Sequence, residues 1–193
     1  QGVSSAASDV YKRQVLPEMR RIAKIVNFGI MYGAGSFRLS QELGVPFAES
    51  KKIIDVYFEK YKGIKQYMEN TKLLVRKDKS IQTLLGRKRA VWDSDSQNQV
   101  RRDAAERMAI NMPIQGTAAE IIKIAMVRIQ NYLDISNLKS KMIMQVHDEL
   151  IFETPENEKT EIQNLLYDLM PSSIELKVPL EIEIKSGKTW GSW

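Results

Sequence analysis

Apolar side chains recur at helical spacing through the N-terminal part of the chain. Positions three and four residues apart place one hydrophobic face on each segment. Gly44 and Pro46 stop the second segment, and Gly63 separates the last two. The pattern predicts four helices, over residues 20–33, 37–43, 47–61 and 64–77.

Helical spacing returns in the middle of the chain, where a proline divides it. Residues 97–112 are expected to form a helix that Pro113 interrupts or ends, because proline lacks the N–H that a helix interior needs. Thr117 and Glu120 have the spacing of a capping box, so we expect a second helix to begin there and run to about residue 133. A further amphipathic helix is predicted over residues 156–170.

Shorter β-favouring runs are bounded by turn residues. Gly86 divides the first pair of runs and His147-Asp148-Glu149 divides the second, so both pairs are expected to be hairpins. Near the C-terminus, apolar and charged residues alternate as in a strand with one wet face. The predicted strands are residues 81–85, 90–92, 142–146, 150–153 and 178–185.

Composition narrows the class of protein. The chain has 193 residues, 43% of them hydrophobic and 27% charged, which is normal for a soluble globular domain. It contains no Cys and one His, which excludes a disulfide framework, a thiolate site and a histidine-based zinc cluster. The net charge of +5 is compatible with a polyanionic partner. No apolar run approaches membrane-spanning length, so we expect a soluble, intracellular protein.

Four residues of the first predicted helix combine charge and aromaticity in order. Arg20, Lys24, Phe28 and Tyr32 recur every fourth residue, which overshoots one turn by about 40° and makes a slowly spiralling stripe about 18 Å long. Such a stripe could hold a nucleoside triphosphate lengthwise, with phosphates on the cations and the sugar and base on the aromatic rings.

The alternative is an ordinary amphipathic surface helix. Two features count against it. Cations at a helix N-terminus, as at Arg20 and Arg21, oppose the helix dipole. Glycines late in a helix, as at Gly29 and Gly33, cost about 1 kcal/mol each relative to alanine.

The stripe, written Arg20-x-x-x-Lys24-x-x-x-Phe28-x-x-x-Tyr32-Gly33, resembles the nucleotide-binding helix of the family A DNA polymerases, the bacterial DNA polymerase I family. The resemblance runs from about Leu16 almost to the C-terminus. It includes several further motifs in the family's order, namely Gly86-Arg87, Arg107, Asn111, Gln115-Gly116 and Gln145-Val146-His147-Asp148-Glu149.

This resemblance implies an α+β fold of the right-hand polymerase type. It assigns residues 15–100 to a helix-rich fingers subdomain and residues 101–193 to the C-terminal part of an antiparallel palm sheet backed by helices. It implies template-directed DNA synthesis by the parent protein, in DNA replication or repair, with primed DNA and a dNTP as partners. It also implies a cytoplasmic, nucleoid-associated protein of a bacterium or phage, with no membrane partner.

The resemblance also implies roles for individual residues. Arg20 and Lys24 would bind the triphosphate, and Lys24 would protonate the leaving group. Phe28 would lie at the sugar, where some relatives carry Tyr, and would discriminate against sugars that lack the 3′-hydroxyl. Tyr32 would complete the nucleotide site.

On the DNA side, the family match implies that Arg107, Asn111 and Gln115 check the primer-terminal pairs, since long polar side chains can reach minor-groove acceptors present on all base pairs. Without the resemblance they would be a polar helix face. His147 would approach the primer end, with Gln145 beside it on the DNA. The arginine-rich turn at Arg87 would contact DNA phosphates, although basic turns are more often simply solvated.

The acidic turn would supply the metal site. An aspartate in a turn commonly caps backbone amides, so its position alone does not indicate a ligand. In the family, Asp148 corresponds to one of two aspartates that hold Mg²⁺, with Glu149 as an auxiliary acid. Mg²⁺ prefers oxygen ligands and needs only one or two carboxylates besides substrate phosphates. A two-metal mechanism would then activate the primer 3′-hydroxyl and stabilise the leaving pyrophosphate.

The family's second aspartate belongs to a D-x-S-x-x-E strand upstream of the fingers helix, and residues 1–17 do not contain it. We therefore expect these 193 residues to be a fragment, inactive when isolated, that lacks the N-terminal palm, the thumb and any exonuclease domain. Residues 1–14 have no hydrophobic periodicity, and we expect a translated adapter or a disordered leader there.

Two other classes of protein remain open. The first is a non-catalytic DNA-binding remnant or split subunit, although such a module would not need Arg20, Lys24, Tyr32 and Asp148 together. The second is a basic helical protein with no nucleic-acid role, which salt-dependent binding of primed DNA would discard.

Overall fold

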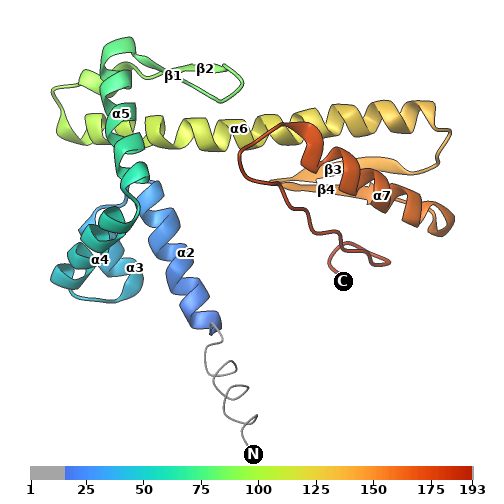
Figure 1. Ribbon diagram of the computed structural model, residues 1–193, viewed down its shortest axis with the longest axis horizontal. Helices are drawn as coiled ribbons and strands as arrows, with labels where there is room; N and C mark the ends of the chain where they lie inside the picture. The colour runs from blue at the N-terminus through green and yellow to red at the C-terminus, as the bar shows by residue number, and fades with distance from the viewer. Residues whose placement is uncertain (1–15, 193) are drawn as a thin grey trace, which may run out of the picture. The chain divides into compact units, whose positions relative to one another are not determined.

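The structure is a computed structural model, which describes residues 16–192 (Figure 1). The described residues form two compact units. The first comprises residues 16–82 and 88–113, and the second comprises residues 83–87 and 114–192. The helix-rich α+β architecture with small antiparallel sheets is confirmed.

The first unit begins with the helices that the apolar periodicity predicts. Pro17 starts the first of them at a position where its missing N–H costs nothing. The helices are α2 (Pro17–Met31), α3 (Ser36–Leu43), α4 (Phe47–Lys60) and α5 (Lys62–Asp78). Gly44 ends α3 in the left-handed conformation, at φ 67°. The break between α4 and α5 lies at Tyr61, so the expectation that Gly63 separates them is wrong by two residues.

A short hairpin follows, formed by β1 (Ser80–Gln82) and β2 (Lys88–Ala90). The expected strands are shifted, since Lys88 and Arg89 pair with β1 and do not belong to the turn. Trp92, expected in the second strand, begins the short 3-10 helix η1 (Trp92–Asp95). The hairpin and α5 pack on the start of the next helix through a cluster of buried side chains, made of Val75, Ile81, Val91, Ala105, Ala109 and Met112.

The helix α6 (Gln99–Ile135) is 37 residues long and contains Pro113. The prediction of two helices divided at this proline is therefore wrong. An internal proline costs about 3 kcal/mol in an isolated helix, but buried packing on both sides of it can offset that cost. Ala109 belongs to the cluster of the first unit and Ala125 to that of the second. The Tyr67 hydroxyl also donates a hydrogen bond of 2.8 Å to the carbonyl of Ile110.

The second unit contains the predicted C-terminal hairpin, with β3 (Lys141–Val146) paired to β4 (Glu149–Glu153). It continues through η2 (Glu156–Glu158), α7 (Lys159–Leu169) and η3 (Pro171–Ser173). Figure 1 shows α7 alongside the two strands. The core lies where α6 and α7 meet and consists of Ala125, Ile129, Leu133, Ile162, Leu165 and Leu166, with Leu150 and Phe152 of β4 against it.

The predicted strand over residues 178–185 is wrong. These residues form no ladder of hydrogen bonds with any described strand. The predicted alternation is nevertheless present. Leu180, Ile182 and Ile184 are half-buried, and the two isoleucines pack against the second core. Glu181 and Glu183 are exposed. The segment therefore has one apolar and one wet face without the hydrogen bonds of a sheet.

None of the helices within residues 16–192 is both long and apolar enough to cross a membrane.

Candidate functional site

The four residues of the predicted stripe are all exposed: Arg20, Lys24 and Phe28 lie on α2, and Tyr32 follows its last residue as the C-cap. Their neighbour Arg21 forms an ion pair with Glu18, at 2.6 Å between Nη2 and Oε1. Among residues 16–192, neither Arg20 nor Lys24 forms an ion pair. Two cations one helical turn apart are therefore free to bind an anion, and the third nearby cation is neutralised within the helix.

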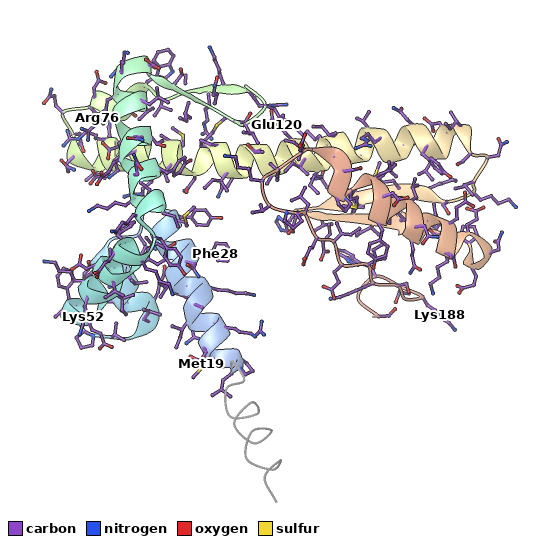
Figure 2. All side chains as sticks on the ribbon, in the orientation of Figure 1. Met19, Phe28, Lys52, Arg76, Glu120 and Lys188 are labelled. Carbon is purple, nitrogen blue, oxygen red and sulfur yellow. The ribbon has the colours of Figure 1, made fainter. Side chains whose placement is uncertain are left out.

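The aromatic end of the stripe is ordered by stacking. The rings of Phe28 and Tyr32 lie 6.0 Å apart between centroids, with 20° between their planes. They remain 55% and 38% exposed, and Phe28 projects from α2 in Figure 2. Two exposed parallel rings on one helix face provide a flat apolar surface, which suits a sugar or base.

A hollow of about 290 Å³ lies beside this surface, between α2 and α3. Lys24 and Phe28 of α2 line it together with Tyr32 at the end of that helix, while Arg38 and Glu42 line it from α3. Arg38 Nε donates to Glu42 Oε1 at 2.8 Å. Sequence reasoning missed this pair, although two opposite charges four residues apart on a predicted helix are a recognisable signal. The hollow places a polar wall opposite the stripe.

The turn after α2 brings Arg107 into this unit's site. Gly33 has φ +75°, and a Cβ built on it would lie 2.8 Å from Arg107 Cγ. Only glycine fits so close a contact in that conformation. Arg107, on α6, therefore packs directly against Gly33, the residue that follows the predicted stripe. The sequence indicated Arg107 as a DNA contact but not its contact with Gly33.

Asn111 and Gln115 also lie on α6, as the continuous helix requires. Asn111 is half-buried, and within the described residues its Oδ1 is buried without a hydrogen-bond partner. A buried acceptor left unpaired is costly and often marks a site where another group binds. Gln115 is exposed.

Arg87 closes the turn of the first hairpin, and it is anchored. Its Nε donates to Glu120 Oε1 of α6 at 2.9 Å. The Thr83 hydroxyl and the Arg87 guanidinium lower the pKa of the Glu120 carboxyl. Thr117 Oγ1 accepts from the backbone N–H of Leu84 at 3.0 Å. Thr117 and Glu120 therefore do not form a capping box, since they lie inside α6 and bind the hairpin turn.

The acidic motif lies at the turn between β3 and β4, as predicted. His147 has φ 54°, and a positive φ at the first turn position is typical of two-residue hairpins. Gln145 Nε2 donates to the His147 carbonyl at 3.1 Å. Asp148 and Glu149 are exposed, and neither carboxylate forms an ion pair or hydrogen bond with another described residue. Both carboxylates are therefore available to a cation.

The donor set of this turn fits Mg²⁺ only in part. Within the described part of the chain, no three His, Asp or Glu side chains gather closely enough to hold a metal ion. Two exposed neighbouring carboxylates are nonetheless what a Mg²⁺ site requires when substrate phosphates and water supply the remaining ligands. Asp148 and Glu149 meet this requirement.

The predicted site residues are divided between the two units. The first unit contains six of them, namely Arg20, Lys24, Phe28, Tyr32, Arg107 and Asn111. The second contains Arg87, Gln115, Gln145, His147, Asp148 and Glu149.

The known proteins that this chain resembles are DNA polymerases. Residues 1–192 match the DNA polymerase family A model. DNA polymerase I of Caldicellulosiruptor bescii is 42% identical over 190 residues, which are 97% of this chain and 22% of that protein. DNA polymerase I of Deinococcus radiodurans is 44% identical over 171 residues, 89% of this chain and 18% of that protein. The chain thus spans about a fifth of the length of these relatives.

A solved structure is similar as well. The polymerase domain of Pol1 from M. smegmatis, in complex with DNA primer-template and dNTP, has a TM-score of 0.84 and 40% sequence identity. The similarity covers 87% of this chain and 30% of that one. The family match includes residues 1–14, so it extends further toward the N-terminus than the motifs indicated. That this segment is a non-native or disordered leader lies outside the described residues and stays a prediction. The chain belongs to DNA polymerase family A.

Proposed function

We propose that the protein carrying this chain is a DNA-directed DNA polymerase, which transfers a nucleotidyl group from a dNTP to a primer 3′-hydroxyl. The observation that carries this proposal is the exposed stripe of α2, where two cations without an ion-pair partner among the described residues lead into two stacked rings beside a hollow. Family membership supports it, as does the similar M. smegmatis polymerase domain, which is described in complex with primer-template and dNTP.

In this proposal the α2 stripe binds the incoming nucleotide. Arg20 and Lys24 bind the triphosphate, because neither cation is neutralised by a described neighbour. Lys24 also gives a proton to the departing pyrophosphate. Phe28 contacts the sugar and discriminates against sugars without a 3′-hydroxyl. Tyr32 extends the apolar surface next to it.

The turn with Asp148 and Glu149 would hold Mg²⁺. When bound, this ion polarises the reacting phosphate and lowers the pKa of the attacking hydroxyl. Asp148 is the ligand and Glu149 the auxiliary acid, and both are exposed and unpaired among residues 16–192. His147 approaches the primer end, and the hydrogen bond from Gln145 holds its backbone carbonyl.

The DNA-binding residues are polar side chains on α6 and the two hairpins. Arg107, Asn111 and Gln115 test the primer-terminal pairs through minor-groove acceptors. Gln145 lies beside the primer, and Arg87 contacts a phosphate. We assign residues 15–100 to the fingers and residues 101–193 to the C-terminal part of the palm. We also propose a cytoplasmic, nucleoid-associated protein of a bacterium or phage.

A substitution at Asp148 tests the metal-site assignment in the complete protein. Asp148→Asn keeps the side chain's size and removes its charge. Primer extension should fall by at least about a hundredfold, the scale of losing one electrostatic stabiliser of the transition state. The affinity for primed DNA should change by less than about twofold, because Asp148 makes no phosphate contact in this proposal. Loss of one phosphate contact would change the affinity by more than that.

Asp134→Asn is the matched control for this test. Asp134 is exposed on α6 and accepts a hydrogen bond from Gln130, so the change removes the same charge away from the turn. Its extension rate should match that of the unmodified protein. Undiminished extension by Asp148→Asn would show that the metal-site assignment is wrong. Salt-dependent DNA binding without any extension by the unmodified protein would favour a non-catalytic DNA-binding remnant or split subunit.

The 193 residues alone should not extend a primer, because they contain no D-x-S-x-x-E motif to supply the family's second carboxylate. Extension by the purified chain would be compared with that of the complete protein on the same primed template. Comparable rates would show that the second carboxylate is not needed or comes from elsewhere in the chain.

A further inference from the structure

Hydrogen bonds within the turn of the first hairpin fix the backbone position of Arg87. Thr83 N–H donates to the Arg87 carbonyl at 2.9 Å, and Gly86 N–H donates to the Thr83 carbonyl at 3.1 Å. Gly86 has φ +87°, the left-handed conformation that completes a three-residue hairpin loop. Arg87 N–H also donates to Thr83 Oγ1 at 3.0 Å. The backbone of Arg87 is therefore held from both sides of the turn.

Two side chains of α6 attach this turn to the helix. Thr117 Oγ1 accepts from the Leu84 N–H, and Glu120 Oε1 accepts from Arg87 Nε. Thr117 and Glu120 are three residues apart, so they lie on the same face of α6. Figure 2 shows Glu120 on α6, near the turn of the hairpin. The contact at Glu120 fixes the guanidinium in addition to the backbone.

The two partners of this ion pair differ in exposure. The Glu120 side chain is 9% exposed, while the Arg87 side chain is 60% exposed. Within the described residues, the Arg87 guanidinium bonds only through Nε. Its two terminal amino groups therefore remain available, and together they form the fork that binds a phosphate through two parallel hydrogen bonds.

We propose that Glu120 is a positioning residue, which holds Arg87 through Nε so that its two terminal amino groups bind a phosphate of the DNA backbone. This inference rests on the proposed function, because it needs DNA to be the partner. A long arginine side chain that is already fixed loses less conformational entropy when it binds. Glu120 supplies this order from a buried position, where it does not compete for the phosphate.

The direction in which DNA affinity changes on substitution of Glu120 tests the proposal. Glu120 is negative, and removal of a negative charge near a polyanion ordinarily strengthens binding. If Glu120 served only to neutralise Arg87, Glu120→Gln would free the guanidinium and tighten DNA binding. If it positions Arg87, the same substitution weakens binding despite the gain in net positive charge.

The experiment measures the dissociation constant of the complete protein for a labelled primed DNA duplex over a range of salt concentrations. We expect Arg87→Ala to weaken binding about three- to tenfold and to lower the salt slope by about one. Glu120→Gln should weaken binding in the same direction by at least about twofold, as misplacement of one phosphate contact would. The double variant should bind no more weakly than Arg87→Ala alone.

Three controls separate positioning from general damage. Asp134→Asn removes one charge from the same helix without touching the hairpin, so its binding should be unchanged or slightly tighter. Arg87→Lys keeps the charge but lacks Nε–H, and in that background Glu120→Gln should no longer weaken binding. Thermal unfolding of each variant shows whether it is folded, and Glu120→Asp replaces Glu120→Gln if the latter does not fold.

The outcomes distinguish this inference from the proposed function. Tighter binding by Glu120→Gln, or losses that add in the double variant, would overturn the positioning role while DNA binding stands. If these variants changed the KM for dNTP without a change in DNA affinity, the phosphate that Arg87 binds would belong to the nucleotide. That result would overturn the assignment to DNA. Absence of salt-dependent DNA binding by the unmodified protein would overturn both.

Discussion

At the scale of single residues, Gly33 brings the end of the α2 stripe against the Arg107 side chain of α6. Its φ of +75° belongs to the left-handed region, and its Cα faces the Arg107 side chain. The close atom is Arg107 Cγ, near the backbone, so Arg107 cannot avoid a new methyl group by moving only its tip. Gly33 therefore lets the Arg107 side chain pack against the backbone that follows α2.

Gly33→Ala should destabilise the protein by about 1–3 kcal/mol, because alanine is strained at positive φ and its Cβ would clash with Arg107. Chemical denaturation of the variant and of the unmodified protein measures this difference. Gly35→Ala is the matched control, since no atom lies within 4 Å of a Cβ at that position and its φ is not in the left-handed region. Equal losses for the two variants would show that the contact between Gly33 and Arg107 has no influence.

At the scale of elements, a buried carboxylate joins the start of β3 to η2. Glu158 accepts hydrogen bonds from the backbone N–H of Lys139 and of Ser140, and from the Ser140 hydroxyl at 2.7 Å. The Lys139 N–H is the largest cause of the lowered pKa of Glu158, followed by the Ser140 hydroxyl. The ionised carboxylate thus fixes where β3 begins, which in turn sets the position of the acidic turn at its other end.

This arrangement predicts a loss of stability in acid. Because the pKa of Glu158 is lower in the folded protein than the ordinary value of 4.5, its contribution is fully present above that value. The contribution disappears as the pH falls through the folded pKa, when the carboxylate is protonated. Melting temperatures of Glu158→Gln should lie below those of the unmodified protein at neutral pH, and the two should converge as the pH falls through the folded pKa of Glu158.

Glu156→Gln provides the comparison for this pH series. Glu156 is exposed and only 3.6 Å from Lys159 Nζ, an arrangement that contributes little. Its melting curve should follow that of the unmodified protein throughout. A constant difference between Glu158→Gln and the unmodified protein at every pH would contradict the role of the charge.

At the scale of the whole molecule, residues 16–192 contain two separate clusters of buried side chains. The cluster around Val75 and the cluster around Ile129 share no residue, and both side chains are completely buried. Only α6 contributes to both clusters. Each unit therefore has its own hydrophobic stabilisation, and each cluster supports the site residues of its own unit.

Ile129→Ala should reduce the stability of the second unit by about 2–5 kcal/mol, through lost burial and an unfilled cavity. Hydrogen exchange would show the loss mainly at the amides of β3, β4 and α7. Val75→Ala, which removes a smaller side chain, should affect α5 and the first hairpin instead. A uniform loss of protection across all described residues from either substitution would show that the two cores unfold as one.

Much of the molecule could be predicted from its sequence, because the deciding forces are local. The 3.6-residue period defined the first four helices, and turn residues defined both hairpins. The acidic turn and the α2 stripe follow from residue spacing within single elements. Even in residues 178–185, where no strand forms, the alternating exposure is as predicted, since burial of every second side chain depends on spacing.

Only the tertiary structure decided how polar residues are used and where elements end. Pro113 and a capping box both indicated a helix boundary, but packing of α6 on both sides of the proline outweighs that local preference. Thr117 and Glu120 bind a turn some thirty residues earlier in the chain. A pattern of neighbouring residues cannot indicate a contact over so long a sequence separation. By itself the sequence determined the first four helices, both hairpins and the order of charged and aromatic side chains along them, since these depend on neighbours along the chain. The continuity of α6, the anchoring of Arg87 and the contact of Gly33 with Arg107 depend on neighbours in space.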